Sequence, residues 1–185
     1  NQSRRQRQMC IRDRDITKSD DYTGDINTEG ILNIGESIDG ELEKSGDRDW
    51  FLISLDESKT YQFDLIGNSL SDPYLYLRNN EGDLLSSNDD GISGLNSQII
   101  FDTNYSGSYF LDVGSYGDNL IGTYNLSALD ITKSDDYAGD INTEGILNIG
   151  ESINGELEKS GDRDWFHISL DESKTYQFDL IGNSL

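Results

Sequence analysis

The sequence predicts an all-β domain, an antiparallel β-sandwich or jelly roll, from three observations. Apolar and polar residues alternate at the two-residue period of a strand in short segments along residues 50–128. Clusters of Asn, Asp, Gly and Ser, which are typical of turns, separate these segments. No segment shows an apolar stripe of helical period and length. About eight short strands at spacings of roughly 10 to 15 residues are typical of this fold class.

Six strands can be assigned in order from their alternation. The apolar faces of the first three are Phe51, Ile53 and Leu55 in WFLISL; Tyr61, Phe63 and Leu65 in TYQFDL; and Leu75 and Leu77 in YLYLR. The later strands are SQIIFD; GSYFLDV with Tyr109, Leu111 and Val113 in phase; and GTYNLSA with Tyr124, Leu126 and Ala128 in phase. The turn signals between them are DESK, NNEGD, SNDDGISG, NYSG and YGDN. A domain of about 100 residues can bury a core large enough to be stable without disulfides.

A tandem repeat organises the chain. Residues 15–70 return as residues 130–185, and the 56 aligned positions differ only at Thr23/Ala138, Asp39/Asn154 and Leu52/His167. We therefore expect an acidic linker and N-terminal strand at 15–30, a complete sandwich at 31–129, a second acidic linker at 130–145, and a truncated second copy at 146–185. The natural protein is expected to be longer at both ends.

The first 14 residues differ from the rest of the chain. Residues 9–14 read MCIRDR, which resembles the translation of an adapter used to prepare sequencing libraries. We expect residues 1–14 to be a sequencing or cloning artefact and exclude them from the fold, so that the chain is interpreted as a fragment of metagenomic type. The alternative is a basic N-terminal arm that binds nucleic acid.

The chain is strongly acidic, with a formal charge of −22. Without residues 1–14 it carries 9 Lys and Arg against 35 Asp and Glu, a formal charge of −26. Nucleic acid and anionic membranes require a positive surface, so neither is an expected partner. No apolar run approaches the roughly 20 residues that span a bilayer. The acidic residues can keep a secreted protein soluble, supply ligands for calcium, or do both.

Several segments together resemble the bacterial pre-peptidase C-terminal domain family. They are GDRDWF, KTYQFDL, DPYLYL, the acidic loop SNDDG, and SGSYFLDVGSYGDNLIGTYNLS, and they cover residues 20–128 once and the first half again from residue 135. The resemblance implies a jelly-roll sandwich without catalytic activity, found in secreted bacterial proteases and other exoproteins. The collagen-binding modules of clostridial collagenases are similar in architecture, and there acidic residues of the N-terminal linker and the strand-entry loop hold calcium.

The resemblance implies a calcium site in each copy. The matching residues are Asp20, Asp21, Asp47 and Asp49 in the first copy and Asp135, Asp136, Asp162 and Asp164 in the second. Calcium takes six to eight oxygen ligands, several of them carboxylates. The alternative is that Asp47 ends a turn, Arg48 pairs with a neighbouring acid, and Asp49 caps the strand.

Two further acidic segments are candidate metal sites. One joins Asp72 to the loop residues Asn88, Asp89 and Asp90, although this loop sequence is also explained by turn formation alone. The other places Asp25, Asn27, Glu29 and Glu36 at positions 1, 3, 5 and 12 of an EF-hand-like loop. Gly24 precedes this loop and SIDG follows it, so the flanking helices of an EF-hand are not expected.

An aromatic stripe is a candidate polymer-binding surface. Tyr74, Tyr76 and Arg78 project from the same side of one expected strand. Tyr and Arg are enriched at interface hot spots, so the stripe could bind collagen or a polysaccharide. Cross-strand aromatic packing on a solvated face explains the same residues without a ligand.

The sequence argues against catalysis. HExxH, GxSxG and P-loop motifs are absent, and the only histidine, His167, replaces Leu52 of the other copy, so no Ser-His-Asp triad can form in the complete repeat. We expect a non-catalytic, calcium-stabilised accessory module of an extracellular, secreted or cell-surface bacterial exoprotein. Its expected partners are neighbouring modules of the same chain and an extracellular polymer. The alternatives are a polymer-binding module or a ligand-free spacer appended to a secreted protease.

Overall fold

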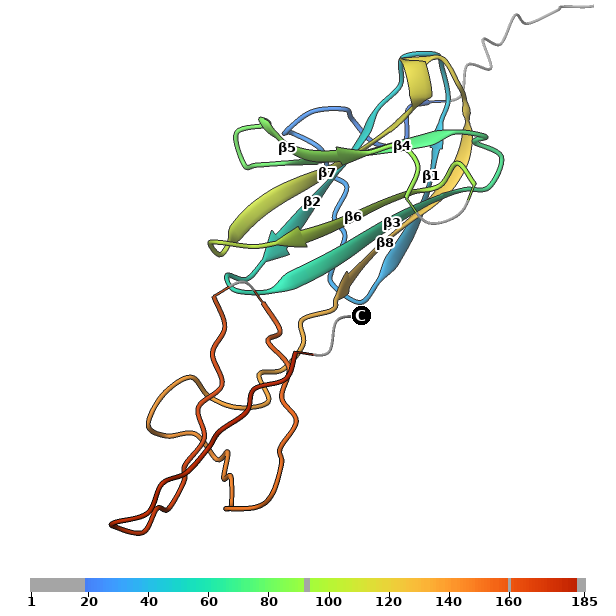
Figure 1. Cartoon of the computed structure of the whole chain (residues 1–185). Helices are drawn as coiled ribbons and strands as arrows, with labels where there is room; N and C mark the ends of the chain where they lie inside the picture. Colours follow the sequence, from blue (N-terminus) through green and yellow to red (C-terminus); the bar gives the residue numbers. More distant parts are fainter. Residues whose placement is uncertain (1–18, 92–93, 160, 183–185) are drawn as a thin grey trace, which may run out of the picture. The chain divides into compact units, whose positions relative to one another are not determined.

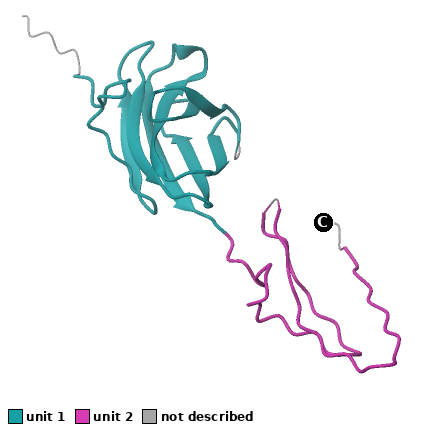
Figure 2. Cartoon of the chain, turned by 90° about the vertical axis from the view of Figure 1, so that its left-hand side faces the viewer, with its two compact units in different colours: residues 1–132 teal, residues 133–185 magenta. Residues whose placement is uncertain are grey.

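The computed structural model describes residues 19–91, 94–159 and 161–182. The adapter-like segment, residues 1–14, lies outside the described residues. The chain divides into two compact units, unit 1 at Asn1–Thr132 and unit 2 at Lys133–Leu185 (Figure 2).

Unit 1 is a sandwich of two four-stranded antiparallel sheets (Figure 1). Its elements are β1 (Ser37–Leu42), β2 (Asp49–Leu55), β3 (Thr60–Gly67), β4 (Pro73–Arg78), β5 (Leu84–Asn88), β6 (Ser97–Asp102), β7 (Gly107–Ser115), the short 3₁₀ helix η1 (Tyr116–Asp118) and β8 (Gly122–Asp130). The strand order is β1-β8-β3-β6 in one sheet and β2-β7-β4-β5 in the other. Eight strands in this order form a jelly roll, which confirms the predicted fold class.

The core lies between the two sheets and consists of the residues that the alternation predicts. One face of each central strand points inward because successive side chains of a strand project to opposite sides. All of the predicted apolar faces are buried: Phe51, Ile53, Leu55, Tyr61, Phe63, Leu65, Leu75, Leu77, Tyr109, Leu111, Val113, Tyr124, Leu126 and Ala128. Each of the buried Leu, Ile, Val and Phe side chains contributes roughly 1.5–3 kcal/mol by leaving water.

The first three strands of unit 1 do not pair with one another. β1 pairs with β8, β2 pairs with β7, and β3 lies between β6 and β8. Every named partner of these strands therefore comes from the later half of the module, between residues 97 and 130.

The N-terminal segment covers the outer edge of β2. Leu52 N donates to Gly30 O at 2.8 Å, and Leu32 N donates to Leu52 O at 3.0 Å, so that Ile31 and Leu52 form a parallel bridge. Gly30 permits this close approach, because a Cβ at residue 30 would lie 2.7 Å from Trp50 O. The segment thus satisfies backbone groups that an edge strand otherwise leaves open.

Unit 2 repeats the local structure of the first copy without its sheets. In its described residues no strand forms, and the one ordered pairing is the parallel bridge between Ile146 and His167 (Figure 2). In the part of the chain that the structure describes, no helix has the length and apolar character needed to cross a membrane.

Candidate metal centre

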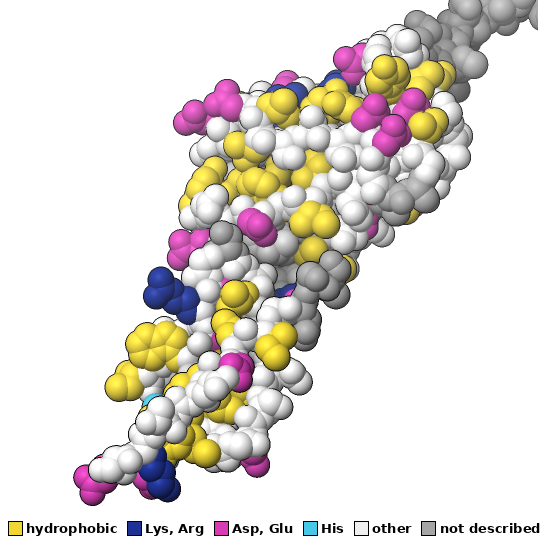
Figure 3. Space-filling model, in the orientation of Figure 1, with side chains coloured by type: hydrophobic (Ala, Val, Ile, Leu, Met, Phe, Trp, Pro, Cys, Tyr) yellow, Lys and Arg dark blue, Asp and Glu magenta, His cyan; other side chains and the backbone are white. Residues whose placement is uncertain are grey.

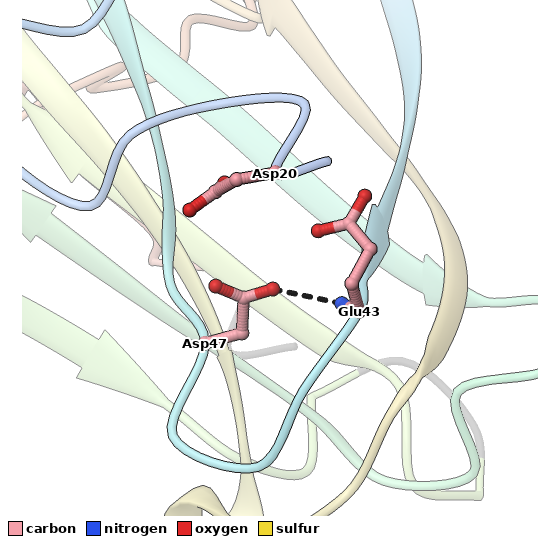
Figure 4. Close-up of side chains that lie close together, drawn as sticks. All are labelled: Asp20, Glu43 and Asp47. Carbon is pink, nitrogen blue, oxygen red and sulfur yellow. Dashed lines mark hydrogen bonds between the residues drawn. The ribbon is translucent and has the colours of Figure 1, made fainter. Parts of the chain in front are cut away.

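Carboxylates from three segments of unit 1 converge where β1 ends and β2 begins. Asp20 belongs to the N-terminal segment, Glu43 follows β1, and Asp47 precedes β2 (Figure 4). One carboxylate oxygen of each lies within 4.8 Å of the others. The turn that links Glu43 to Asp47 closes through the Glu43 N–H, which donates to Asp47 Oδ2 at 2.7 Å, and Gly46 adopts a positive φ of 80° there.

A second group adjoins the first and shares Asp20 with it. It consists of Asp20, Asp21 and Asp49, again with one oxygen of each within 4.8 Å of the others. We call the combined set Asp20, Asp21, Glu43, Asp47 and Asp49 the linker centre. The structure therefore brings together the four acids that the family resemblance indicates in the first copy.

Asp49 is the most deeply buried carboxylate of the linker centre. It lies on the same face of β2 as Phe51 and is fully buried. Its Oδ2 accepts a hydrogen bond of 2.5 Å from the Tyr124 hydroxyl, whereas its Oδ1 is buried without a hydrogen-bond partner among the described residues. Gly40 lies opposite Tyr124, and a Cβ there would meet the hydroxyl oxygen at 2.2 Å, so glycine leaves room for this ring.

The pKa of Asp49 is raised to about 8, first because burial disfavours the charged carboxylate. The negative charges of Asp21, Asp47 and Glu43 raise this pKa further, and the hydrogen bond from Tyr124 opposes the shift. The Asp49 carboxyl thus lies in surroundings that favour either a bound proton or a bound cation.

One lysine partly balances the charge of the linker centre. Lys44 Nζ lies 3.1 Å from Asp20 Oδ2 and 3.3 Å from Asp47 Oδ1. These hydrogen bonds raise the pKa of Lys44, the bond to Asp20 most of all. Because the lysine side chain is largely exposed, the ion pairs contribute little to stability.

Unit 2 repeats this arrangement. Its two groups of acids with oxygens within 4.8 Å of one another are Asp135, Glu158 and Asp162, and Asp135, Asp136 and Asp164. Glu158 N donates to Asp162 Oδ2 at 2.9 Å, as Glu43 N does to Asp47. Asp164 Oδ1, like Asp49 Oδ1, is buried without a hydrogen-bond partner among the described residues.

Glu43 and Glu158 are not among the acids that the family resemblance indicates. Glu43 lies four residues before Asp47, on the other side of the Ser-Gly turn that precedes β2. Its place beside that turn is the signal that could have identified it, because acids flanking one tight turn lie close together.

The structure also brings together Asp72, Asp89 and Asp90, whose oxygens lie within 4.8 Å of one another. Asp72 Oδ1 and Asp89 Oδ1 are buried without hydrogen-bond partners in the described residues. Burial, followed by the charges of Asp90 and Asp72, raises the pKa of Asp89. The Oδ1 of the fourth predicted residue, Asn88, accepts a long hydrogen bond of 3.4 Å from Gln98 N.

The EF-hand-like residues do not converge. Asp25 Oδ1 accepts hydrogen bonds from the Asn27 backbone at 2.7 Å and from its side chain at 3.0 Å. Glu36 instead accepts a bond of 2.9 Å from Asn33. Within the described ranges, Asp25, Glu29 and Glu36 belong to no group of three acids with oxygens within 4.8 Å of one another. The segment is a series of local turns.

The predicted aromatic stripe lies on the outer face of β4, where Tyr74, Tyr76 and Arg78 are half-buried. The Tyr74 and Tyr76 rings contact each other edge to face, with centroids 4.4 Å apart. The Arg48 guanidinium stacks on the Tyr76 ring, with Cζ 4.1 Å from its centroid. This stacking holds the stripe in place beside the strand-entry loop.

A buried aspartate joins the two arginines of this face. Asp112 Oδ2 accepts hydrogen bonds of 2.7 Å from Arg48 Nη2 and from Arg78 Nε. Arg48 Nη1 also donates to Asp118 at 2.9 Å. Strand alternation explains the arrangement, because Asp47 and Asp49 project toward the linker centre while Arg48 projects to the opposite face.

Fold and site together define a jelly-roll module with clustered carboxylates at a strand entry. No family model and no curated protein matches the chain.

Several solved structures are similar to the chain. The pre-peptidase C-terminal domain of a collagenase from Bacillus anthracis is 17% identical, with a match covering 54% of this chain and 92% of that one and a TM-score of 0.44. A periplasmic inhibitor of g-type lysozyme from Aeromonas hydrophila is 13% identical, covering 54% and 97%, with a TM-score of 0.37. A mitogen derived from Yersinia pseudotuberculosis is 16% identical, covering 55% and 89%, with a TM-score of 0.41. The first of these is a domain of the family that the sequence resembles.

Proposed function

We propose that unit 1 is a non-catalytic, calcium-stabilised accessory module of a secreted or cell-surface bacterial protein. The observation that carries this proposal is Asp49, a fully buried carboxylate with one oxygen that has no hydrogen-bond partner among the described residues. Asp49 also groups with Asp20 and Asp21, with one oxygen of each within 4.8 Å of the others. A buried charge is costly unless it is paired or coordinates a metal. A cation bound between the linker and the strand entry would satisfy this oxygen.

The donor set of the linker centre fits calcium. Calcium prefers hard oxygen ligands at about 2.3–2.6 Å, so two ligands on opposite sides of the ion lie up to about 5 Å apart. The carboxylate oxygens of the linker centre lie within this separation in each of its two groups. Bound calcium would neutralise the carboxylates and join the N-terminal segment to the entry of β2.

The chemistry of the linker centre supports a structural role. Residues 19–132 contain no His and no Cys, and the acids of the linker centre contact Lys44 and Tyr124. The acidic surface fits a soluble extracellular module that has no affinity for nucleic acid or anionic membranes.

Calorimetric titration of calcium into the full chain, with thermal melts in calcium and in chelator, tests the proposal. We expect saturable binding and a higher melting temperature of unit 1 in calcium, and a smaller effect of magnesium, which requires stricter octahedral geometry. The double variant Asp47→Ala with Asp49→Asn should lose the calcium-dependent rise in the melting temperature of unit 1. The matched variant Asp162→Ala, in unit 2, should keep it. An undiminished rise in the double variant would rule out the linker centre.

A second candidate function is binding of an extracellular polymer, such as collagen or a polysaccharide, at the aromatic stripe. The ordering of Tyr76 beneath Arg48 favours this possibility, because a rigid aromatic side chain loses little entropy on binding. Pull-down on each polymer, with the parent chain and with Tyr74→Ala and Tyr76→Ala, is the test. Equal retention of parent and variants would exclude the stripe as the binding surface.

A further inference from the structure

We propose that Asn104 is an acceptor for N-linked glycosylation by a bacterial oligosaccharyltransferase, which transfers an oligosaccharide from a polyprenyl diphosphate. This inference rests on the proposed function only for the extracellular location that brings the chain to such an enzyme. It depends neither on calcium binding nor on unit 2.

The chain has three Asn-x-Ser sequons, two of them in residues that the structure describes. These two are residues 104–106 (NYS) and residues 125–127 (NLS), whereas the third begins at Asn1, outside the described residues. The asparagine of such a sequon is an acceptor for N-glycosylation when it lies on the surface of a secreted protein. The place of each sequon in the fold therefore decides which asparagine can be modified.

Asn104 lies in the loop that connects β6 to β7. Residues 104–106 are exposed, and no described residue forms a hydrogen bond with the Asn104 side chain. The base of the loop is held by Thr103, which is buried and whose Oγ1 donates to Lys59 O at 2.9 Å. The loop thus leaves the Asn104 side chain accessible on a fixed base.

Asn125, in contrast, lies inside a sheet. β8 stands between β1 and β3, and Asn125 pairs with Asp39 on one side and with Ile66 on the other. Its Nδ2, the atom that would receive the sugar, donates to Asp39 Oδ1 at 2.8 Å. Transfer to Asn125 would require β8 to leave the sheet, so Asn104 is the acceptor that the fold leaves accessible.

Asp102 supplies a further determinant of acceptor choice. It ends β6, is exposed, and precedes Asn104 by two residues. One class of bacterial oligosaccharyltransferases requires an acidic residue at this spacing, where a carboxylate can pair with a basic side chain of the enzyme. Thr60 Oγ1 donates to Asp102 Oδ1 at 2.6 Å and so orients the carboxylate. The equivalent residue before Asn125 is Thr123, so the second sequon lacks this acid.

Acidic residues alone would indicate little in this chain. Asp and Glu side chains lie at several places on the visible face of unit 1 (Figure 3). What distinguishes residues 102–106 is the combination of an acid, an asparagine and a serine at the required spacing in one exposed loop. The combination matches the acceptor sequence of this enzyme class at a position that the folded protein exposes.

The transfer is a nucleophilic substitution at the sugar. Asn104 Nδ2 forms a bond to C1 of the sugar at the reducing end, and the bond between C1 and the diphosphate oxygen breaks. Polyprenyl diphosphate leaves with the bonding electron pair, and the amide gives one proton to a base of the enzyme. The product is an N-glycosyl amide, and no oxidant or reductant takes part.

The loop and the linker centre lie at opposite ends of β2. Leu55 at the end of β2 pairs with Gly107, directly after the loop, whereas Asp49 at the start of β2 pairs with Val113. A glycan on Asn104 would therefore leave the linker centre uncovered. Glycosylation and calcium binding can be tested separately for this reason.

Secretion of the full chain into a bacterial periplasm, directed by an added leader, tests the proposal. The strain carries an oligosaccharyltransferase that requires the acidic residue, together with its lipid-linked oligosaccharide. Mass spectrometry of the purified chain gives the number of glycans and their position, and we expect one glycan, at Asn104. Unmodified chain that is purified and folded should accept the same glycan from the enzyme in vitro, because residues 104–106 are exposed.

Four variants sharpen the assignment. Asn104→Gln should abolish the modification, whereas Asn125→Gln should keep it. Asp102→Ala should lower the modified fraction about tenfold by removing a charged contact with the enzyme, and Asp102→Glu should retain the level of the parent chain.

Two results would overturn the proposal. One is an unmodified Asn104 both after secretion and in vitro, while a known acceptor protein in the same cells is modified. The other is a glycan on Asn125. Because the added leader delivers the chain whatever its natural location, and because melts of Asn104→Gln in calcium should match those of the parent chain, neither result bears on the calcium proposal.

Discussion

Residues 15–70 and residues 130–185 differ at three positions, yet the first copy forms β1, β2 and β3 while the described part of the second forms no strand. What the copies share is local. Gly35 and Gly150 have φ of 86° and 84°, Gly46 and Gly161 have 80° and 87°, and the turn residues Ser58 and Ser173 have 60° and 62°. Turns therefore form within each copy, whereas strands require a partner.

The difference teaches what strand patterning can specify. Alternating apolar and polar residues allow a segment to bury one face as a strand. Whether the strand forms then depends more on its cross-strand neighbours than on backbone preference. In unit 1 those neighbours lie far along the chain, as in the pairing of Phe51 with Leu111. The sheet is thus a property of the complete module.

The largest expected contrast comes from one core substitution made in each copy. Leu55→Ala should lower the free energy of unfolding of unit 1 by about 2–5 kcal/mol, because it removes a fully buried side chain and leaves a cavity. Leu170→Ala should change it by less than about 0.5 kcal/mol, because Leu170 is exposed. Urea unfolding of the full chain measures both. Equal effects would mean that unit 2 contributes to the core.

The next contrast concerns Arg48 and its counterpart Arg163. Arg48→Ala should lower the free energy of unfolding of unit 1 by about 2–3 kcal/mol, because among the described residues buried Asp112 then keeps only Arg78 as a charged partner. Arg163→Ala should be nearly neutral, because the Arg163 side chain is exposed. Thermal melts of the two variants make the comparison. A neutral Arg48→Ala would show that the ion pairs on this face do not stabilise the fold.

Substitutions of Asp49 and of Asp164 should have different effects on the pH dependence of the stability of unit 1. Without calcium, the raised pKa lets folded Asp49 hold its proton up to about pH 8, whereas the unfolded side chain loses it near pH 4. Stability should therefore fall as pH rises from about 4 to about 8, by at most about 1.4 kcal/mol for each pH unit, and then level off.

Asp49→Asn should abolish the decrease in stability between about pH 4 and pH 8. Asp164→Asn should leave this decrease unchanged. Denaturant unfolding at several pH values, in chelator, checks both variants. Saturating calcium should also flatten the profile of the parent chain, because the bound ion favours the ionised carboxylate. A profile that Asp49→Asn does not change would assign the pH dependence to other groups.

The smallest expected effect is at a position where the copies differ. Asp39→Asn gives the first copy the residue of the second, and Asn125 can donate to an amide oxygen as it does to the carboxylate. Stability should change by less than about 0.5 kcal/mol. A loss of several kcal/mol in a thermal melt would mean that the two copies are not interchangeable partners for β8.

Six of the eight strands could be predicted from the sequence, whereas the edge strands β1 and β5 could not. β3 and β7 alternate clearly because one face is buried, whereas β1 and β5 lie at sheet edges and have mixed exposure in SIDGEL and LLSSN. An edge strand is recognised by the neighbour to which it binds, and in the case of β1 that neighbour begins at Gly122.

The candidate site could be predicted in part. The family resemblance indicated the acids of the N-terminal linker and of the strand-entry loop. Asp49 lies two residues before Phe51, and this spacing places it on the buried face. The pairs Arg48–Asp112 and Asp49–Tyr124 join residues 64 and 75 positions apart. Such contacts depend on strand order, which the alternation of residues does not reveal.

The docking of the N-terminal segment on β2 has a consequence for handling the protein. A protease cut near residue 34 would release the strip of chain that covers this strand and expose the backbone groups of Leu52. An uncovered strand edge is a template for pairing with another molecule. Preparations trimmed at their N-terminus should therefore self-associate more than intact chains do during storage.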